Sequence, residues 1–286
     1  MLSANIRKLR KEAGLSQERM AEELCVSRQA VTKWETDGGA PDLDNLQAIA
    51  RLFGVTVDSL LARDPEEQMQ PRAPLYTSVT QCDAEAQRDF DIDFGYARNV
   101  TLQGIPGEKV RVTLSSGEIA DVESLFKVRL DTGGKSIDIN IVHTEEATSA
   151  QARDALDVLI ELPALWENHV ELAGNATCIT MEGLHAKRVE LGGKFSQLLL
   201  DGCAETVDVD TNQDLAITST ALPARLNVNQ VSATSRLALP AGATFSIRKR
   251  GIGNRIVLEG VSAAEGAFSQ IELNGMKSEL TISAMA

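Results

Sequence analysis

A short pattern recurs along the chain between residues 170 and 239: an apolar residue, any residue, and a second apolar residue. Consecutive copies begin eight to eleven residues apart, and Gly, Asn or Asp follows many of them. Because a strand directs alternate side chains to opposite faces, each copy predicts a short strand with one buried face. Repetition at this spacing predicts strands stacked side by side, with two strands and about 19 residues in each turn of the stack. The copies begin at Val170, Ile179, Val189, Leu198, Val207, Leu215, Leu226 and Leu237.

This regularity predicts an all-β domain over residues 76–286, built as a β-solenoid. The solenoid is preferred to a β-sandwich, which is the alternative all-β fold, because the spacing holds over seven consecutive intervals. Aromatic residues make up only 4% of the chain, which suits a narrow interior filled by Val, Leu and Ile. Residues 145–155, EEATSAQARDA, are polar and rich in Ala, and they predict a loop or a short helix on the surface.

The first 63 residues have the periodicity of short amphipathic helices instead. Ser16, Ser27 and Asp42 each stand directly before such a segment and are of the residue types that cap helix N-termini. The apolar residues inside each segment recur three or four positions apart, so that each helix has one buried face. The expected five helices cover residues 4–13, 17–24, 28–35, 43–53 and 56–61.

The two regions predict an α + β protein with its helices and strands in separate domains. Residues 64–75 contain three of the eight prolines and have no apolar periodicity, which predicts a linker between domains 1–63 and 76–286. The charge also divides at this point. The first domain contains nine basic and nine acidic residues, so the remaining 19 basic and 32 acidic residues carry the whole net charge of -13.

The second and third expected helices are joined by only Cys25, Val26 and Ser27, and the small residue Ala21 allows them to approach closely. This is a helix-turn-helix arrangement. The stretch SQERMAEELCVSRQAVTKWETDGGAPDLDNLQAIARLFGVTVDSLL closely resembles the Xre/Cro-like, phage-repressor-type DNA-binding domain of bacterial regulators, and the resemblance covers residues 4–62. It implies a domain that binds double-stranded DNA with its third helix in the major groove.

The resemblance also implies roles for matched positions. Arg28 and Gln29 begin the third helix, where Arg pairs with guanine and Gln with adenine. Thr32 and Lys33 lie one turn later and reach a thymine methyl, a base edge or a phosphate, while the Gln17 amide donates to a backbone phosphate. The full implied DNA-binding set is Arg10, Gln17, Ser27, Arg28, Gln29, Thr32 and Lys33.

Residues 76–286 resemble, more loosely, the adhesin-type β-solenoids of many bacterial proteins. The stretches that carry this likeness are RVELGGKFSQLLLDG, TVDVDTNQ and LALPAGATFSIRKRGIGNRI. Such domains are attached to varied partners, so the likeness supports a fold and implies no activity. Within the last stretch, RKRGIGNR at 248–255 is a basic cluster in an acidic domain. It predicts either a solvated hairpin or a contact with DNA or with an acidic patch of a neighbouring subunit.

The expected function is a sequence-specific transcriptional regulator, a repressor, that reads a palindromic operator as a homodimer. Its β-domain sets the oligomeric state or senses a signal, through an unidentified protein or small-molecule effector. The acidic β-domain repels the duplex and so weakens non-specific binding. The alternative is an antitoxin or scaffold whose β-domain binds a basic partner protein while the helix-turn-helix regulates its own gene.

No enzyme, metal or cofactor site is expected. The three histidines lie in separate segments without a second ligand at metal-binding spacing, and no nucleophile elbow, Walker loop or dinucleotide fingerprint occurs. The four cysteines form no CxxC pair, which suits a reducing compartment. The N-terminal residues lack the apolar core of a signal peptide, and no apolar run has membrane-spanning length. A cytoplasmic protein that does not enter a membrane is expected.

Overall fold

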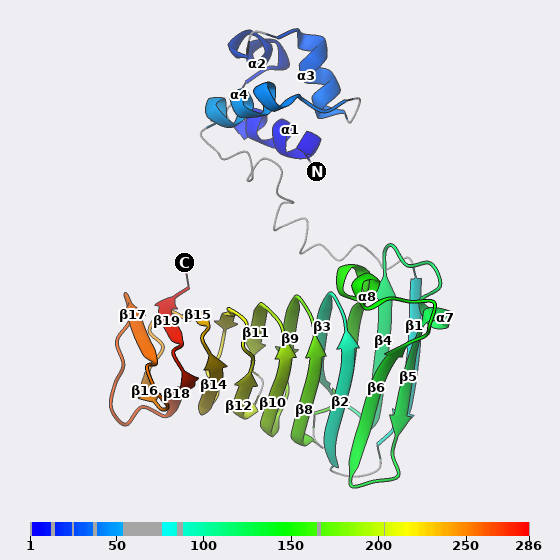
Figure 1. Cartoon of the computed structure of the whole chain (residues 1–286), viewed down its shortest axis with the longest axis vertical. Coiled ribbons are helices and arrows are strands. Elements are labelled where there is room, and N and C mark those ends of the chain that lie inside the picture. Colours follow the sequence, from blue (N-terminus) through cyan, green and yellow to red (C-terminus); the bar gives the residue numbers. More distant parts are fainter. Residues whose placement is uncertain are drawn as a thin grey trace. The chain divides into compact units, whose positions relative to one another are not determined.

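The computed structural model describes residues 2–12, 15–24, 26–36, 39–53, 76–84, 88–164, 167–202 and 204–285. The chain divides into two compact units, residues 1–72 and 73–286, which are described separately (Figure 1). The expected linker at 64–75 lies outside the described residues, so its bounds stay a prediction.

The smaller unit is helical. Its described helices pack around one apolar cluster in which Ile6, Met20, Val31 and Ile49 are completely buried. Because these residues recur at helical spacing, each helix buries one face and leaves the other in water. The fifth expected helix, at 56–61, lies outside the described residues. The helices are α1 (Leu2–Glu12), α2 (Gln17–Glu23), α3 (Arg28–Glu35) and α4 (Leu43–Phe53).

Side-chain caps begin three of these helices, as the sequence predicts. Ser27 Oγ accepts a hydrogen bond from the backbone N–H of Ala30 (3.2 Å) at the start of α3. Ser16 Oγ accepts from the Arg19 N–H (3.1 Å), and an Asp42 carboxylate oxygen accepts from the Asn45 N–H (2.9 Å). Each bond satisfies a donor that has no partner inside its helix, so the caps fix where α2, α3 and α4 begin.

The larger unit contains two sheets of strands, as expected for an all-β domain. Two short helices, α7 (Val122–Leu125) and α8 (Ser149–Ala155), accompany them, and α8 falls within the segment expected to be a loop or a short helix. The ten-stranded sheet has the spatial order β1 (Tyr76–Asp83), β4 (Lys109–Ser116), β7 (Asp157–Pro163), β3 (Asn99–Ile105), β9 (Cys178–Glu182), β11 (Gln197–Asp201), β13 (Ala216–Ser219), β15 (Thr234–Leu239), β19 (Glu279–Ala284), β17 (Arg255–Glu259). The nine-stranded sheet has the order β16 (Phe245–Lys249), β18 (Ser269–Met276), β14 (Arg225–Val231), β12 (Ala204–Asp210), β10 (Ala186–Lys194), β8 (Glu167–Asn175), β2 (Arg88–Tyr96), β6 (Ser136–His143), β5 (Phe126–Asp131).

From β8 onward, consecutive strands alternate between the two sheets, and neighbours within each sheet are parallel (Figure 1). Between β8 and β15, the paired apolar residues are 18 to 20 positions apart in the sequence, which is the spacing that the apolar pairs predict. One such row in the nine-stranded sheet is Val170, Val189, Val207 and Leu226. Its counterpart in the ten-stranded sheet is Ile179, Leu198, Ile217 and Leu237.

The stack is not uniform over the whole of residues 76–286, in contrast to the expectation. Strand β4 pairs antiparallel with both β1 and β7, and β5 pairs antiparallel with β6. Residues 109–163 lie between β3 and β8 in the chain, yet β2 and β3 pair directly with β8 and β9. The inserted strands therefore extend the sheets at one end. Neither sheet closes on itself among the described strands.

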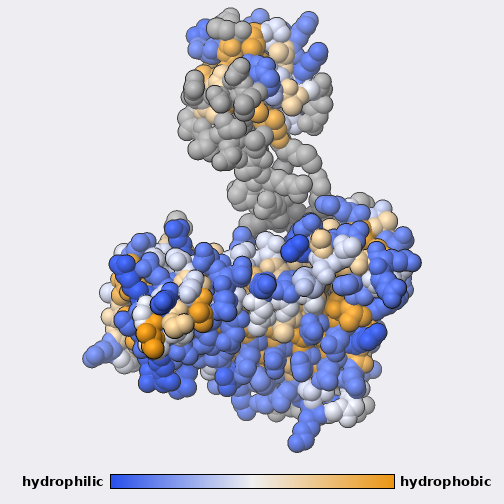
Figure 2. Space-filling model, in the orientation of Figure 1, coloured by the Kyte–Doolittle hydropathy of each residue, from blue (hydrophilic) through white to orange (hydrophobic). Residues whose placement is uncertain are grey.

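The two sheets enclose a continuous apolar core. Val, Leu and Ile line most of it, and Phe90, Phe94, Phe195 and Phe245 are its largest buried side chains. The surface of this unit visible in Figure 2 is mainly hydrophilic. Alternation of inward apolar and outward polar residues along each strand produces this division.

Glycine is required where coils of the chain approach most closely. Gly193 has φ +129°, and a Cβ on it would lie 1.8 Å from the carbonyl oxygen of Gly174 in the next strand. The adjacent Gly192 has open space around its Cα and an ordinary φ. The Gly-Gly pair therefore contains one essential and one replaceable glycine.

Candidate nucleic-acid interface

One face of α3 is buried and the other is exposed and basic. Val31 is completely buried and Trp34 is 7% exposed, so this side of the helix packs against the rest of the helical unit. Arg28, Gln29 and Lys33 are exposed on the remaining surface. Arg28 and Gln29 begin the helix, at the end where side chains of a helix-turn-helix reach base edges, and Lys33 lies in its last turn.

Buried Glu35 connects this helix to the two that precede it. Its carboxylate accepts hydrogen bonds from Arg10 Nε (2.6 Å), Arg10 Nη2 (2.9 Å) and Gln17 Nε2 (2.8 Å). Arg10 Nη1 donates to the carbonyl oxygen of Leu15 (2.7 Å). These contacts join α1, α2 and α3 through a single side chain, so they set the angle at which α3 is presented.

The ion pair is strongly held in its charged form. Burial alone raises the pKa of Glu35, but hydrogen bonds from Arg10 and Gln17, with the positive charges of Arg10 and Arg7, outweigh it. The net pKa of Glu35 therefore lies below its ordinary value of 4.5. The hydrogen bond to Glu35 raises the pKa of Arg10 in turn. Both groups stay ionised at neutral pH.

Gln17 lies between this network and α3. Besides donating to Glu35, its amide oxygen is 3.3 Å from Thr32 Oγ1, which is also 3.0 Å from the carbonyl oxygen of Arg28. The Gln17 side chain is half-buried. An amide carries two N–H groups, and the Glu35 bond uses one of them. Gln17 is thus held in a fixed orientation, and its second N–H bonds to none of the residues that the structure describes.

Arg10 is placed differently from the other expected DNA-binding residues. Its side chain is 12% exposed, and Nε, Nη1 and Nη2 all donate to protein oxygens. Arg28, in contrast, has a 64% exposed side chain. Arg10 is therefore part of the support behind α3, and a sequence pattern of basic residues does not distinguish the two situations.

Sequence reasoning missed an acidic neighbour of Arg28. Glu18, in the first turn of α2, places Oε2 3.4 Å from Arg28 Nη1, and its side chain is 65% exposed. An exposed pair of this kind contributes little to stability, at most about 1 kcal/mol. The contact places the guanidinium beside the first turn of α2.

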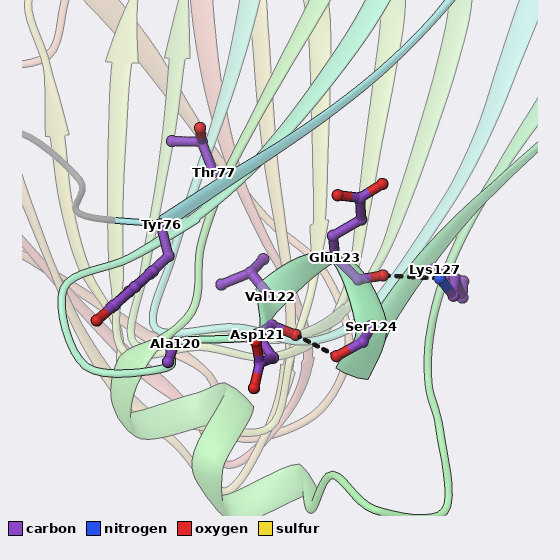
Figure 3. Close-up of a pocket in the computed structure, with 8 residues that line it drawn as sticks. All are labelled: Tyr76, Thr77, Ala120, Asp121, Val122, Glu123, Ser124 and Lys127. Carbon is purple, nitrogen blue, oxygen red and sulfur yellow. Dashed lines mark hydrogen bonds between the residues drawn. The ribbon is translucent and has the colours of Figure 1, made fainter.

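The larger unit has an open hollow of about 590 Å³ beside α7 (Figure 3). Two of its side chains bond to backbone oxygens of α7 and the residue before it: Lys127 Nζ donates to the Glu123 carbonyl oxygen (2.7 Å), and Ser124 Oγ donates to that of Asp121 (3.0 Å). Within the described ranges, no three His, Cys, Asp or Glu side chains are placed to hold a metal ion. The hollow is lined by Tyr76, Thr77, Ala120, Asp121, Val122, Glu123, Ser124 and Lys127.

The basic cluster at 248–255 is partly neutralised by neighbouring strands. Arg248 and Arg250 both approach Glu272 of β18, at 3.5 and 3.2 Å, and Arg255 approaches Glu279 of β19 at 3.3 Å. All three arginine side chains are nevertheless more than half exposed.

The capped α2 and α3, their short connection and the exposed basic face of α3 define a helix-turn-helix DNA-binding unit. Residues 6–60 match the family model described as helix-turn-helix. The chain is 32% identical over 138 residues to the HTH-type transcriptional regulator ImmR of Bacillus subtilis, a match that covers 48% of this chain and 94% of that protein. The chain belongs to the Xre-like family of HTH-type transcriptional regulators.

Two further relatives match over shorter stretches of the chain. The HTH-type transcriptional activator BcrR of Enterococcus faecalis is 44% identical over 57 residues, 20% of this chain and 28% of BcrR. The HTH-type transcriptional regulator YqaE of Bacillus subtilis is 35% identical over 69 residues, 24% of this chain and 60% of YqaE. The chain thus spans less than two thirds of these two proteins. Each of these relatives is named as a regulator of transcription.

The larger unit is similar to solved structures of candidate adhesins. One is a candidate cell adhesion protein from Clostridium sporogenes, with a TM-score of 0.43 and 11% identity over 73% of this chain and 100% of that one. Another is from Bacteroides fragilis, with a TM-score of 0.40 and 10% identity over 74% of this chain and 98% of that one. Among the helices that the structure describes, none has the length and apolar character needed to span a membrane.

Proposed function

We propose that the protein is a sequence-specific regulator that inserts α3 into the major groove of an operator. The observation that carries this proposal is the row of exposed Arg28, Gln29 and Lys33 on a helix whose opposite face is buried. Arg28 pairs with guanine and Gln29 with adenine, while Lys33 and Thr32 bind a neighbouring base edge or phosphate. Ser27 and the second N–H of Gln17 contact phosphate groups of the DNA backbone.

Arg10 acts in this proposal as a positioning residue. With its guanidinium bound to Glu35 and Leu15, it holds α1 against α3 and sets the orientation of Arg28 without reaching the duplex. Replacement of Arg10 therefore weakens binding to all DNA sequences together, whereas replacement of Arg28 or Gln29 changes which sequence is preferred.

A single helix-turn-helix makes few base contacts, so we infer that two copies bind a palindromic operator with half-sites about 34–36 Å apart. The β-domain would bring the copies together or respond to an effector, and its parallel region would wind as a solenoid. We infer that the protein is a repressor, which would exclude RNA polymerase by occupying the promoter. Because BcrR is named as an activator, a promoter–reporter assay must determine the direction of control. Control of transcription in a bacterium takes place in the cytoplasm, where we place the protein.

The decisive experiment selects bound fragments from genomic DNA with the wild-type chain and with Arg28→Ala and Gln29→Ala variants. Each variant should lose about 1–3 kcal/mol of binding free energy and relax the preference at one base of each half-site. Arg236→Ala, which removes an exposed arginine from β15, serves as the control and should bind as the wild type does. Unchanged recognition by a folded double variant would refute the proposal.

The charge of the β-domain should also affect binding. If the acidic domain repels the duplex, the full chain binds random DNA more weakly at low salt than residues 1–63 do, and added salt removes the difference. A salt titration of both forms tests this point. Tighter non-specific binding by the full chain would contradict it.

One observation favours a second candidate function, an antitoxin or scaffold with a basic protein partner. The outer face of the nine-stranded sheet carries a row of carboxylates in register on neighbouring strands, formed by Asp91, Glu171, Glu190 and Asp208, the last of which is only 7% exposed. Arg188 lies close to two of them, Glu190 (3.1 Å) and Asp208 (2.8 Å). Purification from the native cell would test this function, which requires a basic protein in stoichiometric amount.

A further inference from the structure

Strand β17 leaves one edge of the ten-stranded sheet unpaired. Among the described strands, it is bonded to β19 on one side only, and it lies with β16 at one end of the stack (Figure 1). Its sequence is Arg255-Ile256-Val257-Leu258-Glu259. An edge of this kind, with three consecutive apolar residues, is a template for pairing with another strand.

The edge strands at the other end of the two sheets are more polar. Strand β1 contacts the short helix α7 and contains Thr, Ser, Gln and Asp around one exposed Val79. Strand β5 exposes Lys127, Arg129 and Asp131, charges of the kind that discourage pairing. The outer edge of β16 is partly occupied, because the Phe245 carbonyl oxygen accepts a hydrogen bond from the Ala264 N–H (2.8 Å). Strand β17 is thus the edge with the least protection among those described.

Apolar side chains are also incompletely covered at this end. Ile256 and Leu258 are in register with Leu280 and Ile282, which are completely buried, and so point toward the core. They remain only partly buried because no further strand covers them. Nearby in the same terminal coil, Ile247 of β16 is 40% exposed. A stack normally covers such an end with a polar cap or with another chain.

The direction of the backbone groups of β17 can be assigned. The Arg255 N–H donates to the Ser278 carbonyl oxygen (2.9 Å), so Arg255 directs its backbone toward β19. Successive residues of a strand direct their N–H and C=O groups to opposite sides. The backbone N–H and C=O groups of Val257 and Glu259 therefore also face β19. The backbone N–H and C=O groups of Ile256 and Leu258 point away from β19, toward the open edge.

We propose that β17 is a homodimer interface, in which it pairs antiparallel with β17 of a second copy across a two-fold axis at Val257. This register places Ile256 opposite Leu258 of the second copy, and both residues have outward-pointing backbone groups, so each pair exchanges two hydrogen bonds. It also places Arg255 opposite Glu259 of the second copy. The two-fold axis generates an equivalent pair between Glu259 of the first copy and Arg255 of the second, so the interface contains two pairs of opposite charge.

This inference rests on the proposed homo-oligomeric regulator and names the surface that joins its copies. The charges of Arg255 and Glu259 favour a second copy of β17 as the partner strand and fix the register in which the two strands pair. A two-fold contact must be self-complementary, and β17 has one basic end, one acidic end and an apolar centre. Arg255 is 72% exposed and is 3.3 Å from Glu279, so it can turn toward a new carboxylate at small cost. Shifting the register by one residue would place one charge opposite an apolar side chain and the other opposite Asn254 or Gly260, so both charge pairs would be lost.

The test measures the mass of the full chain without DNA, by sedimentation equilibrium over a range of concentrations. The wild-type chain should be a dimer. Arg255→Glu and Glu259→Arg each replace two attractive pairs by two repulsive ones, and each should raise the dimer dissociation constant about tenfold or more. The double variant R255E/E259R restores opposite charges and should return to within about threefold of the wild type. Arg236→Glu, on the same sheet but two strands from the edge, is the matched control and should not change the constant.

Circular dichroism melts would confirm that each variant is folded. A monomeric wild type at micromolar concentration would overturn the proposal, as would single reversals that dimerise as the control does. A double variant as weak as either single variant would exclude this register. Because DNA is absent, a chain that dimerises through β17 yet binds no operator would refute the proposed function and leave the interface in place.

Discussion

Glu35→Gln should nearly unfold the helical unit while leaving the β-domain intact. Glu35 is 1% exposed and accepts three hydrogen bonds that link α1, α2 and α3. Glutamine keeps the size of the side chain and one acceptor oxygen but removes the charge. The guanidinium of Arg10, only 12% exposed, would then have no carboxylate beside it in this network. Removing one partner of a buried ion pair typically costs about 3–5 kcal/mol.

That cost is close to the whole stability expected for the unit. At about 0.05–0.15 kcal/mol per residue, a unit of about 60 residues is stable by about 3–9 kcal/mol. Urea denaturation of the full chain, followed at 222 nm, reports chiefly on the helices. The helical transition should move to much lower urea concentration, with the β-domain transition unchanged.

A matched control distinguishes burial from charge. Glu18→Gln removes the carboxylate beside Arg28, where both side chains are about two thirds exposed, and should cost at most about 1 kcal/mol. The double variant Arg10→Met/Glu35→Leu should recover much of the unfolding free energy that Glu35→Gln loses, because apolar side chains need no charged partner. A loss below about 1 kcal/mol in Glu35→Gln would refute the reasoning.

Three further predictions follow from the same structure. Folding lowers the pKa of Glu35, so the ionised carboxylate contributes its full stabilisation above pH 4.5, the ordinary pKa, and loses it as the pH falls through the lower pKa of the folded state. Thermal melts of the helical unit at decreasing pH should show this loss of stability, and the Glu35→Gln variant should not show it. Gly193→Ala should destabilise the β-domain by at least about 2 kcal/mol in urea titrations, because of its positive φ and the 1.8 Å approach, whereas Gly192→Ala should change it by less than about 1 kcal/mol. Asp42→Ala removes the cap of α4 and should cost about 0.5–2 kcal/mol, measured by the melting temperature of the helical unit.

The sequence predicts best where a local period decides the structure. The apolar pairs beginning at Val170 and Val189 occur once per strand, and the aligned strands have the predicted spacing. The face of α3 is predictable for the same reason, because Val31 and Trp34 are three residues apart and must share a buried side.

Non-local pairing was not predictable. Nothing in the spacing of residues 109–163 indicates that β7 lies between β3 and β4, since that order depends on which exposed edges find each other. Arg10 is a second example. Its partner Glu35 is 25 residues away, and a basic residue on an amphipathic helix gives the same pattern whether it faces DNA or a buried carboxylate.

The order of the last strands in space differs from their order along the chain. Strands β18 and β19 lie between β14–β15 and β16–β17 in both sheets, although β16 and β17 precede them in sequence. Residues 245–259 therefore cannot reach their final neighbours until residues 269–284 have been synthesised and have added to the growing stack. During translation, β17 has no strand to pair with until β19 has been synthesised. The edge proposed to join two copies therefore forms only after nearly the whole chain has been made, and two nascent chains cannot pair through it earlier.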